Sequence, residues 1–392
     1  LMHLYELCDR PELKYPAFKA SMPNALSHQE DYFSVIAERD VLVHHPYQSF
    51  ATVLEFMRQA AVDPGVLAIK QTLYRTEVDS PVIDALVKAA QNGKEVTVIV
   101  ELMARFDEAR NVELADHLYA AGVHVLYGVV GFKTHAKACL VLRQEEDQLR
   151  RYAHLGTGNY HPGTARMYTD YGFFTSNEKI TKDLNQLFLQ LSSLAPDPDN
   201  EILLQAPFFM FNEFLKRIKK CEKAARAGNP TKIIAKINSL TEPNIIEALY
   251  KASQAGVKIQ LIVRGICCLR AQVPGLSENI EVRSIVGRYL EHTRVYYFDY
   301  GSKNEDGDKN LEVFLSSADW MERNLHHRVE IAFPVTEVKS QKRIYRNLEF
   351  ALKDQSAWQL LENGAYQRIK NNYKLDHTMQ SELMRIHGIH AK

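Results

Sequence analysis

Two histidines, each followed two positions later by a cation, are the residues in this sequence best suited to chemistry. His135 precedes Lys137, and His292 precedes Arg294. Residues i and i+2 of a strand lie on one face, so each imidazole and its cation should face the same point. Imidazole is a competent nucleophile towards phosphorus near neutral pH, and a second imidazole can donate or accept a proton. The two pairs therefore predict phosphoryl chemistry in one pocket that both histidines share.

A short run of small polar residues follows each histidine. The first run is Gly-Thr-Gly-Asn at residues 156–159, and the second is Ser-Ser-Ala-Asp at residues 316–319. Small residues let backbone N–H groups approach an anion closely, so we expect both runs to offer donors to a phosphate. We include Asn159, the last residue of the first run, among the candidate phosphate ligands.

Three arginines stand at or just after apolar segments that read as strands. Arg75 follows Gln-Thr-Leu-Tyr, Arg105 lies in Val-Glu-Leu-Met-Ala-Arg-Phe, and Arg264 ends Leu-Ile-Val-Arg. Guanidinium groups are permanently charged and bind phosphate oxygens in a bidentate manner. Open α/β sheets bind their ligands near the ends of the strands. The three arginines therefore favour a polyanionic ligand.

These residues belong to a long-range repeat. Residues 82–101 and 245–264 are identical at nine of twenty positions. Each copy shows an amphipathic helical pattern, a glycine stop at Gly93 or Gly256, and then a β-branched strand. Pro81 and Pro243 stand just before the helices, where a helix start tolerates proline. The repeat predicts two similar units whose half-sites face each other across a pseudo-twofold axis.

Alternation of helical and strand patterns indicates an α/β protein with mixed sheets flanked by helices. The first copy continues with a helix at 111–121 and a strand at 123–127, and the second with a strand at 280–286. The Pro- and Asp-rich segment at 192–200 separates the copies. We expect residues 1–20 to be the end of a preceding domain, 21–197 the first domain, and 198–392 the second domain with a helical C-terminal tail.

The composition is that of an ordinary soluble globular protein. The chain has 392 residues, with 48 Lys plus Arg against 48 Asp plus Glu, so its formal charge is zero. Zero net charge argues against a general nucleic-acid binder. The cysteine count of five is odd and includes no CxxC pair, which predicts neither a disulfide framework nor a zinc knuckle. We expect no membrane-spanning helix and a cytoplasmic location.

The histidine motifs resemble the phospholipase D superfamily signature H-x-K-x(4)-D, with departures. Leu142 stands at the aspartate position of the first copy, and Arg294 replaces lysine in the second. The chain is more similar to the polyphosphate kinases that use a phosphohistidine intermediate. From about residue 30 to 335 it carries, in order, KQTLYR, ELMARFDE, KTHAKACLV, LGTGNY, ARMYTDYG, LIVRGICCL, LEHTRVY and LSSADWMERN.

The resemblance implies two tandem phospholipase D-like α/β domains and the reversible transfer of the ATP γ-phosphoryl group to inorganic polyphosphate. His135 would be phosphorylated, and His292 would assist proton transfer or hold phosphate. Arg75 and Arg105 match the family's Mg²⁺ site, where they would act through phosphate oxygens because a guanidinium has no acceptor atom. The residues expected to bind ATP or phosphate are Tyr168, Arg264, His292, Arg75, Arg105, Lys137, Arg294 and Asn159.

Two other functions are compatible with these residues. A phospholipase D-type phosphodiesterase or phosphatidyl transferase would use the same histidine, and a non-catalytic module would only bind a polyanion. The expected partners are ATP, ADP and inorganic polyphosphate, with no nucleic acid. We also expect a homo-oligomer and peripheral association with the inner face of a membrane, without a transmembrane segment.

Overall fold

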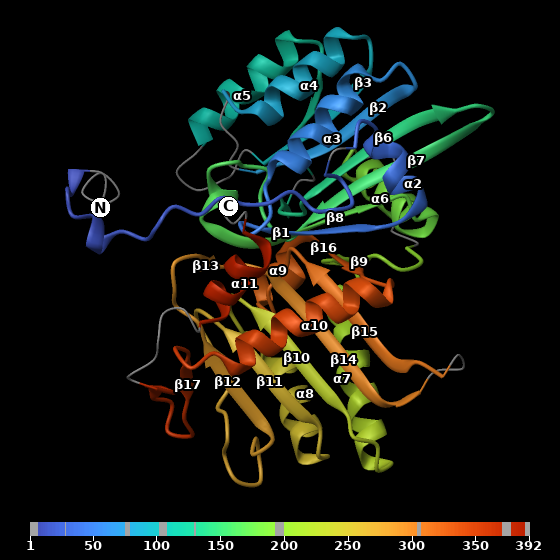
Figure 1. The fold of residues 1–392 in the computed structure, drawn as a ribbon. Helices are drawn as coiled ribbons and strands as arrows, with labels where there is room; N and C mark the ends of the chain where they lie inside the picture. Colours follow the sequence, from blue (N-terminus) through green and yellow to red (C-terminus); the bar gives the residue numbers. More distant parts are fainter. Residues whose placement is uncertain are drawn as a thin grey trace.

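The structure is a computed structural model that describes residues 7–27, 29–74, 79–101, 108–128, 131–192, 200–303, 307–370 and 378–388. Figure 1 shows two halves stacked on each other, the first in blue to green and the second in yellow to red. Each half is built around one mixed β-sheet. In the described part of the chain, no helix combines the length and the apolar character that crossing a bilayer requires.

The first sheet has the strand order β1-β8-β7-β6-β2-β3-β4. Strands β2, β3 and β4 are parallel, and the remaining neighbours are antiparallel. The strands are β1 (Val41–His45), β2 (Val66–Leu73), β3 (Glu95–Val100), β4 (His124–Leu126), β6 (Ala138–Glu145), β7 (Gln148–Gly156) and β8 (Tyr168–Thr175).

The second sheet repeats this order as β9-β16-β15-β14-β10-β11-β12, and the β17-β18 hairpin extends its edge. Strands β10, β11 and β12 are again parallel. The strands are β9 (Leu204–Ala206), β10 (Lys232–Ile237), β11 (Lys258–Val263), β12 (Ile280–Ser284), β14 (Arg294–Lys303), β15 (Lys309–Ser316), β16 (Arg328–Pro334), β17 (Trp358–Leu360) and β18 (Tyr366–Arg368). The shared order confirms the α/β fold with mixed sheets.

Helices cover the outer faces of both sheets and fill the space between the sheets. The outer helices of the first half are α2 (Tyr32–Glu38), α3 (Ala51–Val62), α4 (Pro81–Gln91) and α5 (Glu108–Ala120), and those of the second half are α7 (Met210–Arg226) and α8 (Pro243–Gln254). The inner elements are α6 (Glu178–Leu191), α10 (Val338–Lys353) and α11 (Met379–His387). Three further short helices occur in the described part of the chain: η1 (Pro11–Leu13), η2 (Thr164–Arg166) and α9 (Glu322–His327).

The two sheets share one apolar core. Phe173 of the first sheet and Phe333 of the second are fully buried, and their rings stack with centroids 5.7 Å apart. Side chains of α6 and α10 belong to the same cluster. Aromatic burial of this kind is a major source of folding free energy, so the halves stabilise each other.

The predicted helix starts and stops of the repeat are confirmed. Pro81 and Pro243 occupy the first turns of α4 and α8, where a missing N–H costs no hydrogen bond. Gly93 and Gly256 follow these helices with φ of +81° and +96°. Only glycine adopts these angles without strain, so the same local chemistry ends both helices.

Each half contributes a two-residue strand to the sheet of the other half. Strand β5 (Lys133–Thr134) pairs in parallel with β16, and β13 (Leu290–Glu291) pairs in parallel with β8. Each of these strands is followed directly by a candidate histidine. The exchange therefore brings both candidate histidines to the boundary between the halves.

The expectation that His135 and Lys137 lie in a regular strand is wrong. Strand β6 begins at Ala138, and residues 135–137 have no regular structure. The backbone N–H groups of His135 and Ala136 both donate to the carbonyl of Val329, at 2.9 and 3.0 Å. These two hydrogen bonds attach residues 135 and 136 to β16 of the second half. They take the place of the backbone hydrogen bonds that a strand would form within the first sheet.

Candidate active site

His135 is oriented by a carboxylate of the opposite half. Its Nδ1 lies 2.9 Å from the carboxylate of Glu330, which β16 carries into the boundary and which is completely buried. Only 12% of the His135 side chain is exposed. With a carboxylate at Nδ1, the proton of a neutral imidazole sits on Nδ1 and the lone pair is on Nε2. No described residue hydrogen-bonds to Nε2 of His135.

His292 is held by the reciprocal arrangement. Its Nδ1 lies 2.9 Å from both carboxylate oxygens of Asp170, which belongs to β8 of the first half. Asp170 also accepts a hydrogen bond of 2.6 Å from the Thr157 hydroxyl. Burial opposes ionisation of Asp170, yet the adjacent His292 ring keeps the pKa of this carboxyl below its usual value. Asp170 is therefore a carboxylate at neutral pH.

Both imidazoles are neutral in the folded protein near pH 7. Burial, and then the positive charges of Lys137 and Arg328, place the pKa of His135 well below its usual value. Burial also lowers the pKa of His292, although Asp170 acts in the opposite direction. For Glu330, burial raises the pKa to about 7, against the attraction of Lys137. The ionisation state of Glu330 is thus sensitive to pH in the neutral range.

The two cations differ in what they contact. Lys137 is 1% exposed, its ammonium donates to the carbonyl of His135, and burial places its pKa well below the usual value. Arg294 donates to Asp319 at 3.1 Å and, across the boundary, to the carbonyl of Thr157 at 3.2 Å. Its Nη1 also lies 3.2 Å from Nε2 of His292. Nε2 of His292 is therefore engaged, whereas Nε2 of His135 has no such contact.

The expectation that the small polar runs offer their backbone donors to an anion is wrong for most of their N–H groups. These N–H groups already donate to other groups of the protein. Each run lies at the end of a strand, β7 or β15, where it packs against neighbouring segments. The engaged N–H groups are those of Gly156, Thr157, Ser317, Ala318 and Asp319. The runs instead position side chains: Thr157 binds Asp170, and Asp319 binds Arg294.

Two tyrosines stand beside the histidines. The ring of Tyr168 lies 5.3 Å from that of His292, and the ring of Tyr74 lies 5.1 Å from that of His135. Tyr168 was predicted, but Tyr74 was not. The signal for Tyr74 is its place at the end of β2, directly before Arg75. Both rings can exclude water from the neighbouring imidazole.

Two further candidates lie near this centre. Nε of Arg264 donates to Oδ1 of Asn238 at 2.6 Å, and Asn238 in turn donates to Asp319 at 3.1 Å. The side-chain carbonyl of Asn159 is buried without a hydrogen-bond partner in the structure. Asn159 lines a small cavity together with Gly158 and Asp170. The structure thus brings both residues towards the arginine–histidine cluster of the boundary.

Arg75 and Arg105, the predicted Mg²⁺ site, lie outside the described residues. Among the residues that the structure does describe, no three His, Cys, Asp or Glu side chains gather as metal ligands. Asp170 and Glu330 are each committed to an imidazole. Since Mg²⁺ requires oxygen ligands, these residues do not fit a protein-held magnesium ion.

Asp170 and Glu330 were not predicted from the sequence, although a signal for them exists. They follow Asn159 and Asp319, the last residues of the two small polar runs, by the same eleven positions. Equal spacing in the two copies indicates equal places in the fold. Only the structure shows that each carboxylate serves the histidine of the other copy.

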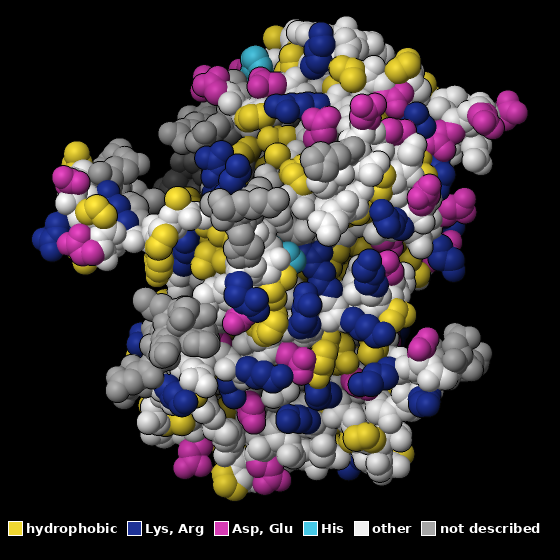
Figure 2. All heavy atoms as spheres, viewed as in Figure 1, with side chains coloured by type: hydrophobic (Ala, Val, Ile, Leu, Met, Phe, Trp, Pro, Cys, Tyr) yellow, Lys and Arg dark blue, Asp and Glu magenta, His cyan; other side chains and the backbone are white. Residues whose placement is uncertain are grey.

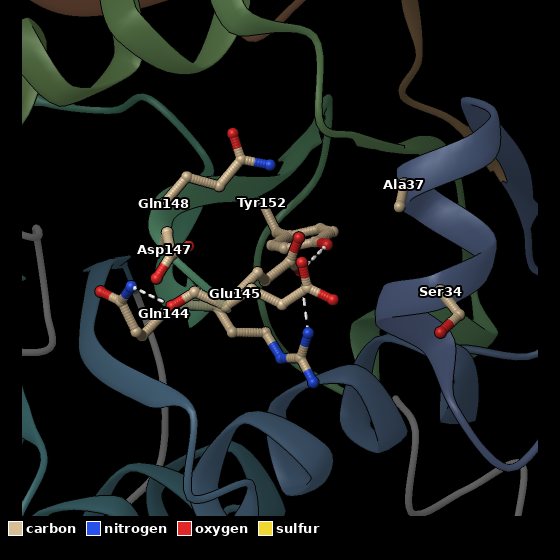
Figure 3. Close-up of a pocket in the computed structure, with 9 residues that line it drawn as sticks. Ser34, Ala37, Gln144, Glu145, Asp147, Gln148 and Tyr152 are labelled. Carbon is tan, nitrogen blue, oxygen red and sulfur yellow. Dashed lines mark hydrogen bonds and ion pairs between the residues drawn. The ribbon is translucent and has the colours of Figure 1, made fainter.

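A separate cavity lies away from the histidines, between α2 and the β6-β7 hairpin (Figure 3). Its volume is about 670 Å³. Glu145 accepts hydrogen bonds there from Arg143, at 2.8 Å, and from the hydroxyl of Tyr152. These three polar groups therefore satisfy one another on the wall of the cavity.

The repeated sheets and the crossed histidine–carboxylate pairs define a phospholipase D-like core made of two α/β halves. The crystal structure of the phosphatidylserine synthase of Haemophilus influenzae Rd KW20 shares this fold, with a TM-score of 0.54 and coverage of 94% of each chain. Its sequence identity is 9%, so the likeness concerns the fold alone.

Within this class, the chain matches two family models: Polyphosphate kinase C-terminal domain 1 over residues 31–197 and Polyphosphate kinase C-terminal domain 2 over residues 203–380. The chain therefore belongs to the polyphosphate kinase family. A polyphosphate kinase of Xylella fastidiosa (strain 9a5c) is 55% identical over 368 residues, which make up 93% of this chain and 51% of the relative. The crystal structure of the Porphyromonas gingivalis polyphosphate kinase has a TM-score of 0.88 and 34% identity, covering 97% of this chain and 58% of that one. The chain spans about half the length of the curated relatives that it matches.

Proposed function

We propose that this chain transfers the γ-phosphoryl group of ATP to the end of inorganic polyphosphate, reversibly, through a phosphohistidine at His135. The observation that carries the proposal is the difference between the two imidazoles. Nε2 of His135 has its lone pair available opposite a carboxylate-bound Nδ1, whereas Nε2 of His292 lies 3.2 Å from an arginine nitrogen. The family membership and the names of the relatives support the choice of ATP and polyphosphate as substrates.

In the first half-reaction, Nε2 of neutral His135 attacks the γ-phosphorus in line. A P–N bond forms, the bond from phosphorus to the β–γ bridging oxygen breaks, and ADP leaves with that electron pair. The imidazole becomes positively charged as it attacks. Glu330 stabilises this charge through Nδ1–H, provided that its carboxyl group is ionised.

In the second half-reaction, a terminal oxygen of polyphosphate attacks the phosphohistidine, and the P–N bond breaks to restore the neutral imidazole. His292, held by Asp170, is placed to hold the incoming phosphate or to exchange a proton with it. Removing a positioned acid or base such as His292 should lower the rate by about 10²–10⁴-fold.

The guanidinium of Arg294 remains charged between the halves. Burial would favour its neutral form, but Asp319 and Asp170 together raise the pKa of Arg294 above its usual value. A fixed positive charge at this place attracts phosphate oxygens. By family resemblance, Arg75 and Arg105 add positive charge, and Tyr168 and Arg264 contact the nucleotide. Mg²⁺ would then be held by substrate phosphates, and we derive no step through the metal.

We propose in addition that the chain divides into domains at residues 21–197 and 198–392, with residues 1–20 belonging to a preceding element. The two matched family segments, 31–197 and 203–380, support this division. The family resemblance also leads us to propose a homo-oligomer, a cytoplasmic location and peripheral attachment to the inner membrane face.

Incubation of the 392-residue chain with γ-labelled ATP tests the proposal. The protein should become labelled, and the label should be lost in acid but survive alkali, as a phosphoramidate does. His135→Ala should remove the label completely, whereas the exposed control His117→Ala should retain it. Undiminished labelling of His135→Ala, or no labelling of the parent chain, would refute the proposal.

Experiments on the same 392-residue chain distinguish the two other functions. A phosphodiesterase of the phospholipase D type would release an alcohol from a phosphodiester without nucleotide and would take no label from ATP. A non-catalytic module would bind polyphosphate equally well in the parent and in His135→Ala, with no transfer in either.

A further inference from the structure

A cavity of about 640 Å³ opens where the two halves and the C-terminal helix meet. Its wall combines residues 39–42 at the start of β1, residues 21–25 of the N-terminal segment, the first turns of α10 and the end of α11. Figure 2 shows Lys and Arg side chains gathered on the face of the molecule where α10 lies. We call this hollow the interdomain basic cavity.

The charges that line this cavity are mostly positive. Five cationic side chains line it, against the two carboxylates of Asp40 and Glu337. None of the five forms an ion pair with a carboxylate among the described residues, and Arg343 alone donates to neutral oxygens of Leu42 and Gln48. Uncompensated charges on a concave wall concentrate anions from solution.

The cations of α10 form one stripe along the helix. Lys339, Lys342, Arg343 and Arg346 follow the spacing i, i+3, i+4 and i+7, which places them on the same face. From the first to the last they advance about 10 Å along the axis. A stripe of this length fits a linear anion with closely spaced charges better than a single phosphate ion.

The cavity also holds buried polar atoms without partners. Arg343 donates to the carbonyl of Leu42 at 2.8 Å and to the side chain of Gln48, which leaves its Nε buried and unpaired in the structure. Nε2 of His387, on α11, is likewise buried without a hydrogen-bond partner. Both side chains belong to the wall of this cavity, and neither is fully satisfied within the protein.

A second cavity adjoins the interdomain basic cavity and shares Phe50 and Ala165 with the small cavity beside Asn159 and Asp170. It has a volume of about 510 Å³, shares Gln48 with the interdomain basic cavity, and is lined by Lys19, Arg166 and Arg288. Arg166 stands two residues before Tyr168, whose ring lies beside His292. Cationic side chains therefore continue from the basic cavity towards the histidines.

We propose that the interdomain basic cavity binds the non-reacting length of an inorganic polyphosphate chain whose end reaches His135. This inference rests on the proposed function and names where the remote part of that substrate is held. The site increases affinity for long chains by binding phosphates far from the reacting bond, and it contributes nothing to very short chains.

The test is the double substitution Lys339→Ala/Lys342→Ala in the 392-residue chain. Both side chains are exposed, so folding should be preserved. The matched control is Lys219→Ala/Lys223→Ala on α7, which removes two exposed lysines from the opposite face of the second sheet. Affinity is measured by fluorescence anisotropy of end-labelled long-chain polyphosphate, and tripolyphosphate binding is measured by calorimetry.

We expect the substitution to weaken long-chain binding by about 10-fold, since two exposed charge contacts with phosphates are lost. The dependence of affinity on salt should also become shallower by roughly one unit of slope, because fewer counterions are released. Tripolyphosphate binding and the control variant should match the parent chain.

Three results would overturn the inference: parent-like binding of long chains by the double variant, an equal loss in the control, or binding of RNA of matched length in preference to polyphosphate. The outcome is separable from that of the labelling experiment. A parent chain that binds polyphosphate through this cavity but takes no label from ATP would refute the proposed function and leave the binding site in place. A chain that is labelled normally, with the double variant binding like the parent, would refute the binding site alone.

Discussion

Replacement of Glu330 by glutamine tests how the first half-reaction depends on the opposite half of the molecule. The substitution keeps the size of the side chain but removes a negative charge 2.9 Å from Nδ1 of His135. The amide can present either its oxygen or its nitrogen to the ring. When the nitrogen faces Nδ1, the imidazole proton moves to Nε2, and the lone pair needed for attack is lost.

The size of the effect follows from the charge that develops during attack. At an effective dielectric constant of about 20, opposite unit charges 2.9 Å apart attract by about 6 kcal/mol, or about 10⁴-fold in rate, as an upper bound. The amide oxygen still accepts a hydrogen bond and recovers part of this stabilisation. We therefore expect Glu330→Gln to slow phosphorylation of His135 by about 10²–10⁴-fold.

The pH dependence gives a second signature. Because burial raises the pKa of Glu330 to about 7, its carboxyl group is protonated in the folded protein below that pH and then lacks the negative charge that stabilises the positively charged ring of His135. The phosphorylation rate of the parent should rise with pH and level off above about pH 7. Glu330→Gln should lose this rise, since no ionisable group remains at that position.

Stability should change with pH in the opposite direction. The folded-state pKa of Glu330 is higher than its usual value of 4.5, so the folded protein binds this proton more tightly than the unfolded chain does. This contribution to stability is present below pH 4.5 and is lost as the pH rises through about 7. Urea denaturation of parent and variant across this range measures it.

The assay is rapid-quench measurement of acid-labile label from γ-labelled ATP at several pH values. A suitable control is Glu349→Gln on the surface of α10, which removes a carboxylate 3.5 Å from Lys353 and far from the reaction. If Glu330→Gln were labelled at the parental rate with an unchanged pH profile, Glu330 would neither orient His135 nor stabilise the positive charge of its ring. The crossed carboxylates would then have no part in the phosphorylation of His135.

Three further predictions concern the other carboxylate and the core. Asp170→Asn should leave formation of the acid-labile label intact but slow polyphosphate growth by about 10²-fold or more, and single-turnover transfer from pre-labelled protein measures this step. Gly158→Ala should resemble it, because a methyl group there would lie 2.1 Å from Oδ2 of Asp170; parental growth rates would contradict the geometry. Trp320→Ala should reduce the free energy of unfolding by about 3–5 kcal/mol, because Trp320 is fully buried and stacks 4.8 Å from Tyr296; an unchanged urea midpoint would contradict this.

The elements of the fold were predictable because their signals are local. The helices α4 and α8 were marked by a proline at the start, a glycine at the end and apolar residues at helical spacing. The strands after them were marked by β-branched runs. The repetition of these signals in the same order also predicted two similar units, since similar local sequences fold alike.

The candidate site was predictable only in part, because its decisive contacts are distant in sequence. Glu330 is separated from His135 by 195 positions, and Asp170 from His292 by 122. Their pairing depends on how the halves pack, which no local pattern encodes. The role of the small polar runs was also misjudged, because whether a backbone N–H is free depends on the neighbouring segment; Thr157, for example, donates to Tyr171.

The crossing of strands and carboxylates between the halves has a consequence for any attempt to divide the molecule. Residues 21–197 expressed alone would contain the nucleophile His135 without the carboxylate of Glu330. Residues 198–392 alone would contain Glu330 without His135. Each fragment would be catalytically inert, however well it folded. Activity should return only when the two fragments are mixed and assemble, so complementation reports directly on the formation of the boundary.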